Sequence, residues 1–267
     1  MYKATKSLMI FIILLTFSVP LISGVYLEGI ESAAHQGQGT TKIYVDADRL
    51  RIESISDAQN TLIIFRQDKE LFWVLDQNKK TYQEMTKDDL KKMKGKIDES
   101  MKMLEEQLKN MPPEQRKMME EMMPKQAMMN AQKMVKKTYV KKLSNVKVGK
   151  WSCTLYQGSA EGEQKEDVWT VDWSQIDIGP EDLTAFQDLG EFFSSLAPDM
   201  TDIFEIGTEE FEKSGGYAGM PVKSVEYEGG KIISSFEMKK LEKKSLDRSL
   251  FELPQGFTKI DSGLEDM

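Results

Sequence analysis

Few residues in this 267-residue sequence could do catalytic or metal chemistry. It contains one histidine, His35, and one cysteine, Cys153. Zinc clusters, disulfide frameworks and Cys-X-X-Cys redox motifs each need several such residues, and a Ser-His-Asp triad needs a histidine in the core. His35 lies in the polar stretch 33–39, where we expect it to be solvated. We predict no metal site and no cofactor.

Three pairs of adjacent carboxylates could in principle supply a general acid and a base. They are Asp88-Asp89, Glu120-Glu121 and Glu209-Glu210. Each pair lies in a charged stretch typical of a solvated face, whereas a catalytic carboxylate needs a shielded environment. The sequence also lacks a Gly-X-Ser-X-Gly elbow and a glycine-rich loop followed by lysine. The protein is therefore predicted not to be an enzyme.

The most unusual feature of the amino-acid composition is its 18 methionines. Met118 and Met122, like Met119 and Met123, are four residues apart, so each pair shares one face of a helix. Thioethers favour Cu(I), which makes a methionine copper site one interpretation. No histidine or cysteine accompanies them, which favours apolar interpretations instead. The four could be an ordinary helical cover on a sheet, or a movable lid that repacks around an apolar ligand.

The elements that would position these methionines change character along the chain. Residues 40–85 form five short β runs separated by turn residues, which predicts an antiparallel meander. Two of its runs, Leu62–Phe65 and Leu71–Leu75, are apolar on both faces, so each face must meet apolar groups. We predict that a ligand-binding surface combines Ile64, Trp73 and Leu75 with Met118, Met119, Met122 and Met123.

At residue 86 the hydrophobic period becomes helical. Thr86 and Asp89 form a capping box, and apolar residues then recur every three or four positions to Met111. Residues 86–137 hold most of the 18 methionines and a basic excess, so they are predicted to be a helical insertion.

Strands resume after residue 137. Cys153 is predicted to be a buried small hydrophobe on a strand, and a helix is expected over 181–197. A hairpin is predicted across Gly229-Gly230, and the tail 250–257 is expected to be an edge segment pinned by Phe251 and Phe257.

The amino terminus has the pattern of a secretory signal. Lys3 and Lys6 precede an apolar run over 8–22, which ends at the small residues Ser23 and Gly24. We predict a signal peptide over 1–24, a linker over 25–39 and one β-rich domain over 40–261, interrupted by the insertion at 86–137. The alternative is an uncleaved membrane anchor over 8–27. No cysteine follows the signal directly, so lipid tethering is not expected.

The segments YVDADRLRIES, TLIIFRQDKELFWVLDQNKKTYQEM, VGKWSCTLY, VWTVDW and LFELPQGF occur in a familiar order. In this order the chain resembles an uncharacterised family of exported bacterial proteins, known only as a domain of unknown function. More distantly it resembles the periplasmic lipoprotein carriers LolA and LolB. The resemblance covers roughly residues 40–85 and 138–260. It implies an α+β fold in which a curved antiparallel sheet, a half-barrel, has helices covering its concave face.

The function expected from these patterns is binding rather than catalysis. A formal net charge of −8 argues against a nucleic-acid partner. We expect a periplasmic or secreted cell-envelope protein that binds an apolar or lipid-like ligand in the concave sheet. The alternative is a structural or interaction protein with an envelope partner and no small ligand. No carrier-type binding residue can be matched, so transport of lipoproteins is not implied.

Cleavage of the signal is directly testable. We expect the mature protein to begin near Val25, because the apolar run is short and Pro20 would end its helix before the cleavage site. N-terminal sequencing of the native protein checks this. Recovery of intact residues 1–24 in a membrane fraction would favour the anchor instead.

Overall fold

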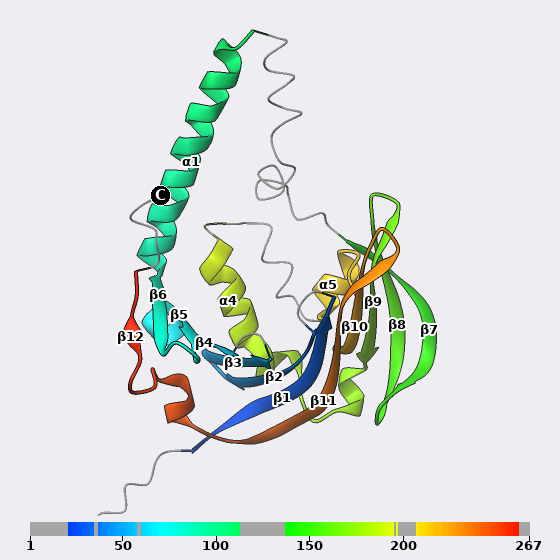
Figure 1. Ribbon diagram of the computed structural model, residues 1–267. Helices are drawn as coiled ribbons and strands as arrows, with labels where there is room; N and C mark the ends of the chain where they lie inside the picture. Colours follow the sequence, from blue (N-terminus) through cyan, green and yellow to red (C-terminus); the bar gives the residue numbers. More distant parts are fainter. Residues whose placement is uncertain are drawn as a thin grey trace, which may run out of the picture.

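A large open sheet dominates the protein. The computed structural model describes residues 21–34, 37–57, 60–112, 137–194, 196 and 207–261. In this part of the chain 12 strands form one sheet that bends along its width (Figure 1). The strand order is β12-β6-β5-β4-β3-β2-β1-β11-β10-β9-β8-β7, and the sheet does not close. Neighbouring strands are antiparallel except β12 and β6, which run parallel. The fold is α+β and mostly β.

The predicted meander is confirmed. Its strands follow one another in both sequence and space, as β2 (Gly37–Asp46), β3 (Arg49–Ser56), β4 (Asn60–Arg66), β5 (Leu71–Asp76) and β6 (Thr81–Thr86). Short turns join them, since each strand pairs antiparallel with the one before it. One 3₁₀ helix, Gln67–Lys69, lies between β4 and β5.

The prediction of a linker over 25–39 is wrong. Residues 25–33 belong to β1 (Leu21–Ala33), which lies between β2 and β11, and residues 37–39 begin β2. Two glycines of β1, Gly24 and Gly29, each allow a close approach within the sheet. A Cβ atom at Gly24 would lie 2.4 Å from the carbonyl oxygen of Val45, and one at Gly29 would lie 2.2 Å from Phe236. The predicted signal overlaps β1 at residues 21–24, and residues 1–20 lie outside the described chain.

The strands after the insertion complete the sheet. They are β7 (Thr138–Val148), β8 (Trp151–Ala160), β9 (Glu163–Val171), β10 (Met220–Glu228) and β11 (Lys231–Asp247). The predicted hairpin joins β10 and β11, and Gly229 and Gly230 both have the positive φ that such a turn requires. Cys153, on β8, is buried as predicted. A 3₁₀ helix over Trp173–Gln175 follows β9.

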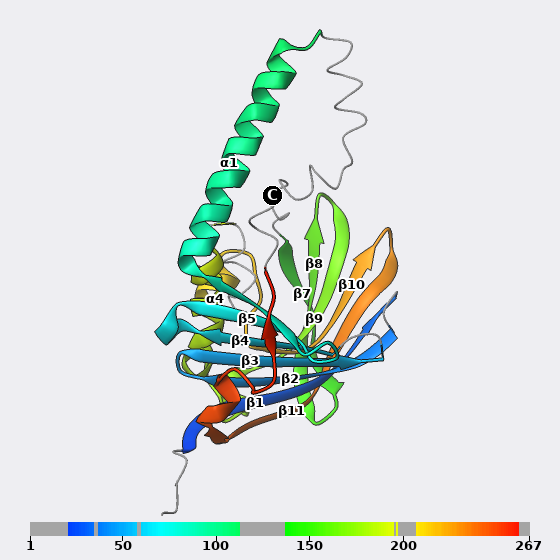
Figure 2. The same cartoon turned by 60° about the vertical axis from the view of Figure 1, so that its left-hand side comes forward.

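Helix α1 (Lys87–Asn110) begins at the predicted capping box. The backbone amide of Thr86 donates to Asp89 Oδ2 at 3.0 Å, and the Asp89 amide donates to Thr86 Oγ1 at 3.2 Å. Leu90 is buried, but Ile97 is 45% exposed, and the helix extends away from the sheet (Figure 2). The described part of the insertion therefore does not cover the sheet as expected, because only its first turn reaches the core.

Helix α4 (Thr184–Ser194) packs on one face of the sheet, which we call the α4 face. It follows a 3₁₀ helix over Pro180–Leu183. The rings of Phe192 and Phe65 are 5.5 Å apart, and those of Phe193 and Phe72 are 5.2 Å apart. Helix α5 (Glu209–Lys213) is a short element before β10. These aromatic contacts fix α4 over β4 and β5, within the main hydrophobic core.

The opposite face of β4 and β5 is covered by the C-terminal strap, residues 248–259. The strap contains a 3₁₀ helix (Arg248–Phe251) and edge strand β12 (Thr258–Lys259), and it crosses the meander in Figure 2. Phe251 is fully buried, and Leu253 and Phe257 pack on a second hydrophobic cluster. The expectation that both faces of these strands meet apolar groups is confirmed, as is the role of the two phenylalanines.

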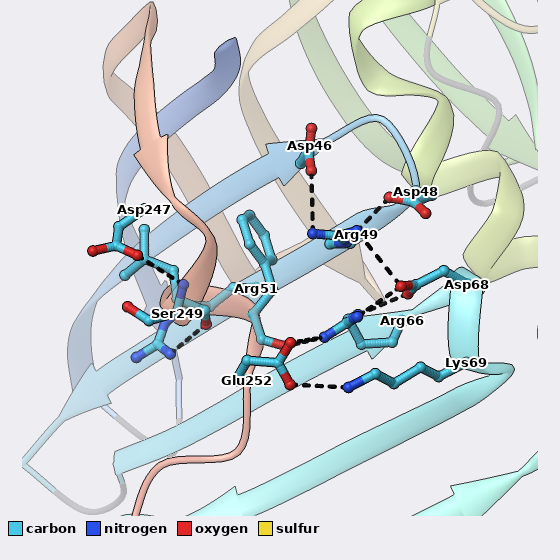
Figure 3. Close-up of polar contacts among 12 residues, drawn as sticks. Asp46, Asp48, Arg49, Arg51, Arg66, Asp68, Lys69, Asp247, Ser249 and Glu252 are labelled. Carbon is cyan, nitrogen blue, oxygen red and sulfur yellow. Dashed lines mark hydrogen bonds and ion pairs between the residues drawn. The ribbon is translucent and has the colours of Figure 1, made fainter. Parts of the chain in front are cut away.

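Ionic contacts attach the strap to the sheet (Figure 3). Arg66 is almost fully buried, donates twice to Asp68 at 2.6 and 2.7 Å, and contacts the carboxylate of Glu252. Lys69 Nζ lies 3.0 Å from the other oxygen of Glu252. Arg51 donates to the carbonyl oxygen of Leu250 at 2.7 Å. Because a buried guanidinium needs acceptors on all sides, Arg66 favours the docked strap.

The strap should loosen in acid. Partial burial opposes ionisation of Glu252, but hydrogen bonds from Lys69 and Arg66 outweigh it and hold the pKa of this carboxyl below its ordinary value. A lowered folded-state pKa means that the stabilisation is present above the unfolded-state pKa and is lost as pH falls through the folded-state pKa. Glu252→Gln should cost about 1 kcal/mol at neutral pH and flatten this acid dependence.

Urea unfolding at a series of pH values measures the effect of Glu252→Gln. Glu210→Gln, on the exposed surface of α5, is the matched control and should leave the pH profile unchanged. Equal acid dependence in wild type and Glu252→Gln would show that the ion pairs do not hold the strap.

Cys153→Ser tests the packing of β8. Cys153 is 1% exposed within the main core, and burial raises the pKa of its thiol. A serine hydroxyl there without a partner should cost about 1–3 kcal/mol of unfolding free energy. Urea unfolding checks the value. Rapid reaction of the folded protein with a thiol reagent would contradict the burial.

Candidate functional site

The α4 face is organised in rows that run across the strands. Directly opposed residues form the buried row, which lies beneath α4 and consists of Val25, Val45, Leu50, Phe65 and Phe72. Each is at least nine-tenths buried. Since side chains alternate between faces along a strand, the rows two and four residues further along each strand lie on the same face.

The second row is the aliphatic row, Ile43, Ile52, Ile63 and Val74, whose members are opposed on β2, β3, β4 and β5. They pack against the core, but each remains partly exposed. The aliphatic row therefore forms the border of the apolar part of the α4 face. An unbroken line of partly exposed aliphatic side chains is a surface that an apolar group could cover further.

The third and fourth rows are polar. Gly29, Thr41, Ser54 and Thr61 are opposed across β1 to β4, and Glu31, Gly39 and Ser56 follow them. Five of these residues, Glu31, Gly39, Ser54, Ser56 and Thr61, line a hollow of about 380 Å³ together with the adjoining ends of β10 and β11. We call it the polar hollow. Its lining is Glu31, Ser32, Ala33, Gly37, Gly39, Ser54, Ser56, Thr61, Ser224, Glu226, Ser234, Ser235 and Phe236.

Serine hydroxyls orient both carboxylates of the polar hollow. Ser54 Oγ donates to Glu31 Oε1 at 2.6 Å, and Ser234 Oγ donates to Glu226 Oε2 at 2.6 Å. Lys137 Nζ lies 3.7 Å from Glu226 Oε1. Among the described residues, no basic side chain pairs with Glu31. The polar hollow therefore has an excess of negative charge.

Lys137 also contacts a second carboxylate, that of Glu166. Lys137 Nζ lies 2.8 Å from a Glu166 oxygen, to which Tyr139 also donates at 2.6 Å. Burial, with the Glu166 carboxylate beside it, raises the pKa of Tyr139 well above the ordinary value. Tyr139 thus remains a neutral hydrogen-bond donor, and Lys137 is shared between Glu166 and Glu226.

Two glycines shape the border between the apolar and polar parts. The Phe236 ring lies over Gly29 and closes the polar hollow against the core, an approach that any side chain at Gly29 would block. A Cβ at Gly39 would lie 3.4 Å from the Glu31 side chain and 3.1 Å from the carbonyl oxygen of Ile55. The absence of these two side chains leaves room for the Phe236 ring and the Glu31 carboxylate.

The structure does not bring the predicted ligand-binding residues to the polar hollow. Ile64, Trp73 and Leu75 are buried on the strap face, where Leu253 and Phe257 cover them. They form a buried cluster on the face opposite to Phe65 and Phe72, because side chains alternate between faces along a strand. Met118, Met119, Met122 and Met123 lie outside the described residues, and so does His35.

The acidic pairs that the sequence offered for catalysis serve local structure where they are described. Asp89 caps α1, and Glu209 lies 3.2 Å from Lys213 on α5. Glu120-Glu121 lies outside the described residues. Within the described ranges, no group of three His, Cys, Asp or Glu side chains is placed to hold a metal ion. The helices described there include none with the length and apolarity needed to span a membrane.

The family of this chain is recognised over its central and C-terminal part. A family model described as a domain of unknown function (DUF4412) matches residues 86–257, more than half of the chain. The chain belongs to the DUF4412 family. The expected membership of an uncharacterised family is thereby confirmed, although the match begins at α1 and includes the insertion. The DUF4412 match contains Glu226 and Ser234, while Glu31 and Ser54 precede it.

No curated protein matches this DUF4412 chain. Among solved structures, it is similar to the crystal structure of an uncharacterized conserved protein from Thermus thermophilus, with 6% identity, a TM-score of 0.46, and coverage of 89% of this chain and 90% of that one. It is also similar to PNGF-II in a C2 space group, with 12% identity, a TM-score of 0.36, and coverage of 92% of this chain but 32% of that one.

Sequence reasoning missed the polar hollow of this DUF4412 protein because its residues come from several strands. Glu31 falls in the predicted linker, and Ser224, Glu226 and Ser234 look like ordinary solvent-facing positions of a hairpin. One signal was available in the alternation of β3. Leu50 and Ile52 are followed on the same face by Ser54 and Ser56, which indicates a face that changes from apolar to polar.

Proposed function

We propose that this protein is a non-catalytic binding protein for an amphipathic, lipid-like ligand. The ligand would lie on the α4 face, with its apolar chain along the aliphatic row and its polar end in the polar hollow. One observation carries the proposal: a partly exposed aliphatic row adjoins a hydroxyl- and carboxylate-lined hollow on one face. A ligand with both an apolar and a polar part matches both surfaces at once.

The energetics support a mixed ligand over a purely apolar one. Burying the exposed part of several aliphatic side chains gains roughly 25 cal/mol for each Å² removed from water. A wholly apolar ligand that extended into the polar hollow would strip water from Glu31 and its neighbouring hydroxyls without replacing their hydrogen bonds. A polar end group in the polar hollow avoids that cost, and the volume of about 380 Å³ suits such a group.

Two expectations from the sequence are part of this proposal: the half-barrel shape of the sheet and the export of the protein. In it, the α4 face is the concave side of a half-barrel like that of LolA and LolB, with α4 as a partial cover. The basic, apolar amino terminus supports export to the periplasm or beyond the cell. Catalysis is not part of the proposal, because Asp89 caps α1 and Glu209 forms a surface ion pair.

Paired variants on β3 test the binding surface. Ile52 belongs to the aliphatic row, whereas Ile55, on the same strand, points to the opposite face and is 40% exposed. Ile52→Gln should weaken binding of a dodecyl amphiphile about tenfold or more, corresponding to about 1.4 kcal/mol of lost apolar contact. Ile55→Gln should leave the affinity unchanged.

Titration calorimetry with dodecyl amphiphiles measures both affinities, and Ile52→Ala provides a milder change if Ile52→Gln lowers the melting temperature. Native mass spectrometry of the purified protein would detect a retained lipid. Equal loss of affinity in Ile52→Gln and Ile55→Gln, or no binding by the wild type, would contradict the proposed function.

A further inference from the structure

The polar hollow also indicates which polar group the ligand carries. Glu31 and Glu226 both line it, but their surroundings differ. Glu226 has Lys137 at 3.7 Å, whereas Glu31 accepts from Ser54 and, among the described residues, faces no cation. A carboxylate that is partly removed from water loses favourable hydration, and without a counter-ion nothing compensates for this loss. A cationic group beside Glu31 would compensate its negative charge.

The hydroxyls around Glu31 suit an ammonium group in particular. An ammonium has three donors and no acceptor, so it needs several oxygen atoms around one point. Glu31 supplies a carboxylate oxygen, and Thr61 and Ser224 bring hydroxyl oxygens to the same lining. An anionic group would be repelled by both carboxylates, and a neutral hydroxyl would leave the charge of Glu31 uncompensated.

Thr41, which adjoins the lining of the polar hollow without being part of it, has a buried hydroxyl. It lies between Gly29 and Ser54 in the polar row and is 9% exposed. Its hydroxyl oxygen is buried, and within the described chain it has no hydrogen-bond partner. Buried hydroxyls are nearly always paired in folded proteins, so this one is suited to an ordered water beside the polar hollow.

We propose that the polar hollow binds the ammonium group of an amine-bearing amphiphile, with Glu31 as its ion-pair partner and the neighbouring hydroxyls as acceptors. This inference rests on the proposed function, because it names the head group of the same ligand. Glu226 assists from the opposite side of the polar hollow, where Lys137 already offsets part of its charge. The amine could belong to a lipid head group or to a free small amine. Probes with a long or a short alkyl chain distinguish these two sources.

Three dodecyl probes with the same chain and different heads test the inference. Titration calorimetry with dodecylamine, dodecanol and dodecanoate should show dodecylamine binding at least about tenfold more tightly than the other two. Butylamine, which has the same head and a short chain, should bind far more weakly than dodecylamine. The preference for the amine should decrease at high salt, because an accessible ion pair is screened.

Glu31→Gln should reduce the affinity for dodecylamine to that for dodecanol, while binding of dodecanol stays the same. Glu226→Gln should cause a smaller loss. Glu28→Gln is the matched control, since Glu28 lies on the same strand but pairs with Tyr26 and Lys240, and it should leave all affinities unchanged. Melting temperatures of the three variants show whether each is folded.

The outcomes separate this inference from the proposed function. Equal binding of the three dodecyl probes, or an amine preference that survives Glu31→Gln in the folded variant, would overturn the ammonium assignment and leave amphiphile binding intact. Binding of butylamine as tightly as dodecylamine would support the ammonium site but contradict the lipid-like ligand. Failure of every dodecyl probe to bind would overturn both.

Discussion

The two strands β4 and β5 are apolar on both faces, and the arrangement of the rest of the protein follows from the need to cover them. Phe65 and Phe72 point to one side, while Ile64 and Trp73 point to the other. Neither side can face water without a large loss of hydrophobic stabilisation. Helix α4 covers the first side and the C-terminal strap covers the second, so the described chain is three layers thick at this place.

The strap is as important as α4 for the site, although it lies on the other face. Its Leu253 and Phe257 pack on the cluster that contains Trp73, whose indole nitrogen donates to Glu84 at 2.8 Å. Lys259 of the strap approaches the other oxygen of Glu84 at 2.8 Å. Together with Arg66, these contacts hold β4 and β5 in place, which keeps their aliphatic row in register with those of β2 and β3. A surface shared by four strands needs such a rigid support.

Along each strand, the α4 face changes from buried apolar to partly exposed aliphatic and then to polar over a few residues. The buried row lies beneath α4, so the border between apolar and polar surface remains open at the aliphatic row. The pairing of β1 with β11 joins the meander to the C-terminal strands. It brings Glu31 and Ser54, which precede the DUF4412 match, beside Glu226 and Ser234 within it. The polar hollow therefore exists only where the two halves of the chain meet.

The sequence by itself determined the local elements: the meander over 40–85, the capping box at Thr86, the Gly229-Gly230 hairpin and the burial of Cys153. Period, caps and turn residues are set by neighbours within a few positions, so they can be read from the chain. Only the tertiary structure decided that residues 25–33 form the strand joining the halves, and that Ile64, Trp73 and Leu75 face the strap. Both depend on partners far away in the sequence, such as Leu246 beside Gly24 and Phe257 beside the cluster that contains Trp73. Alternation shows that a strand has two apolar faces, but which partner covers each face is settled by packing across the whole sheet.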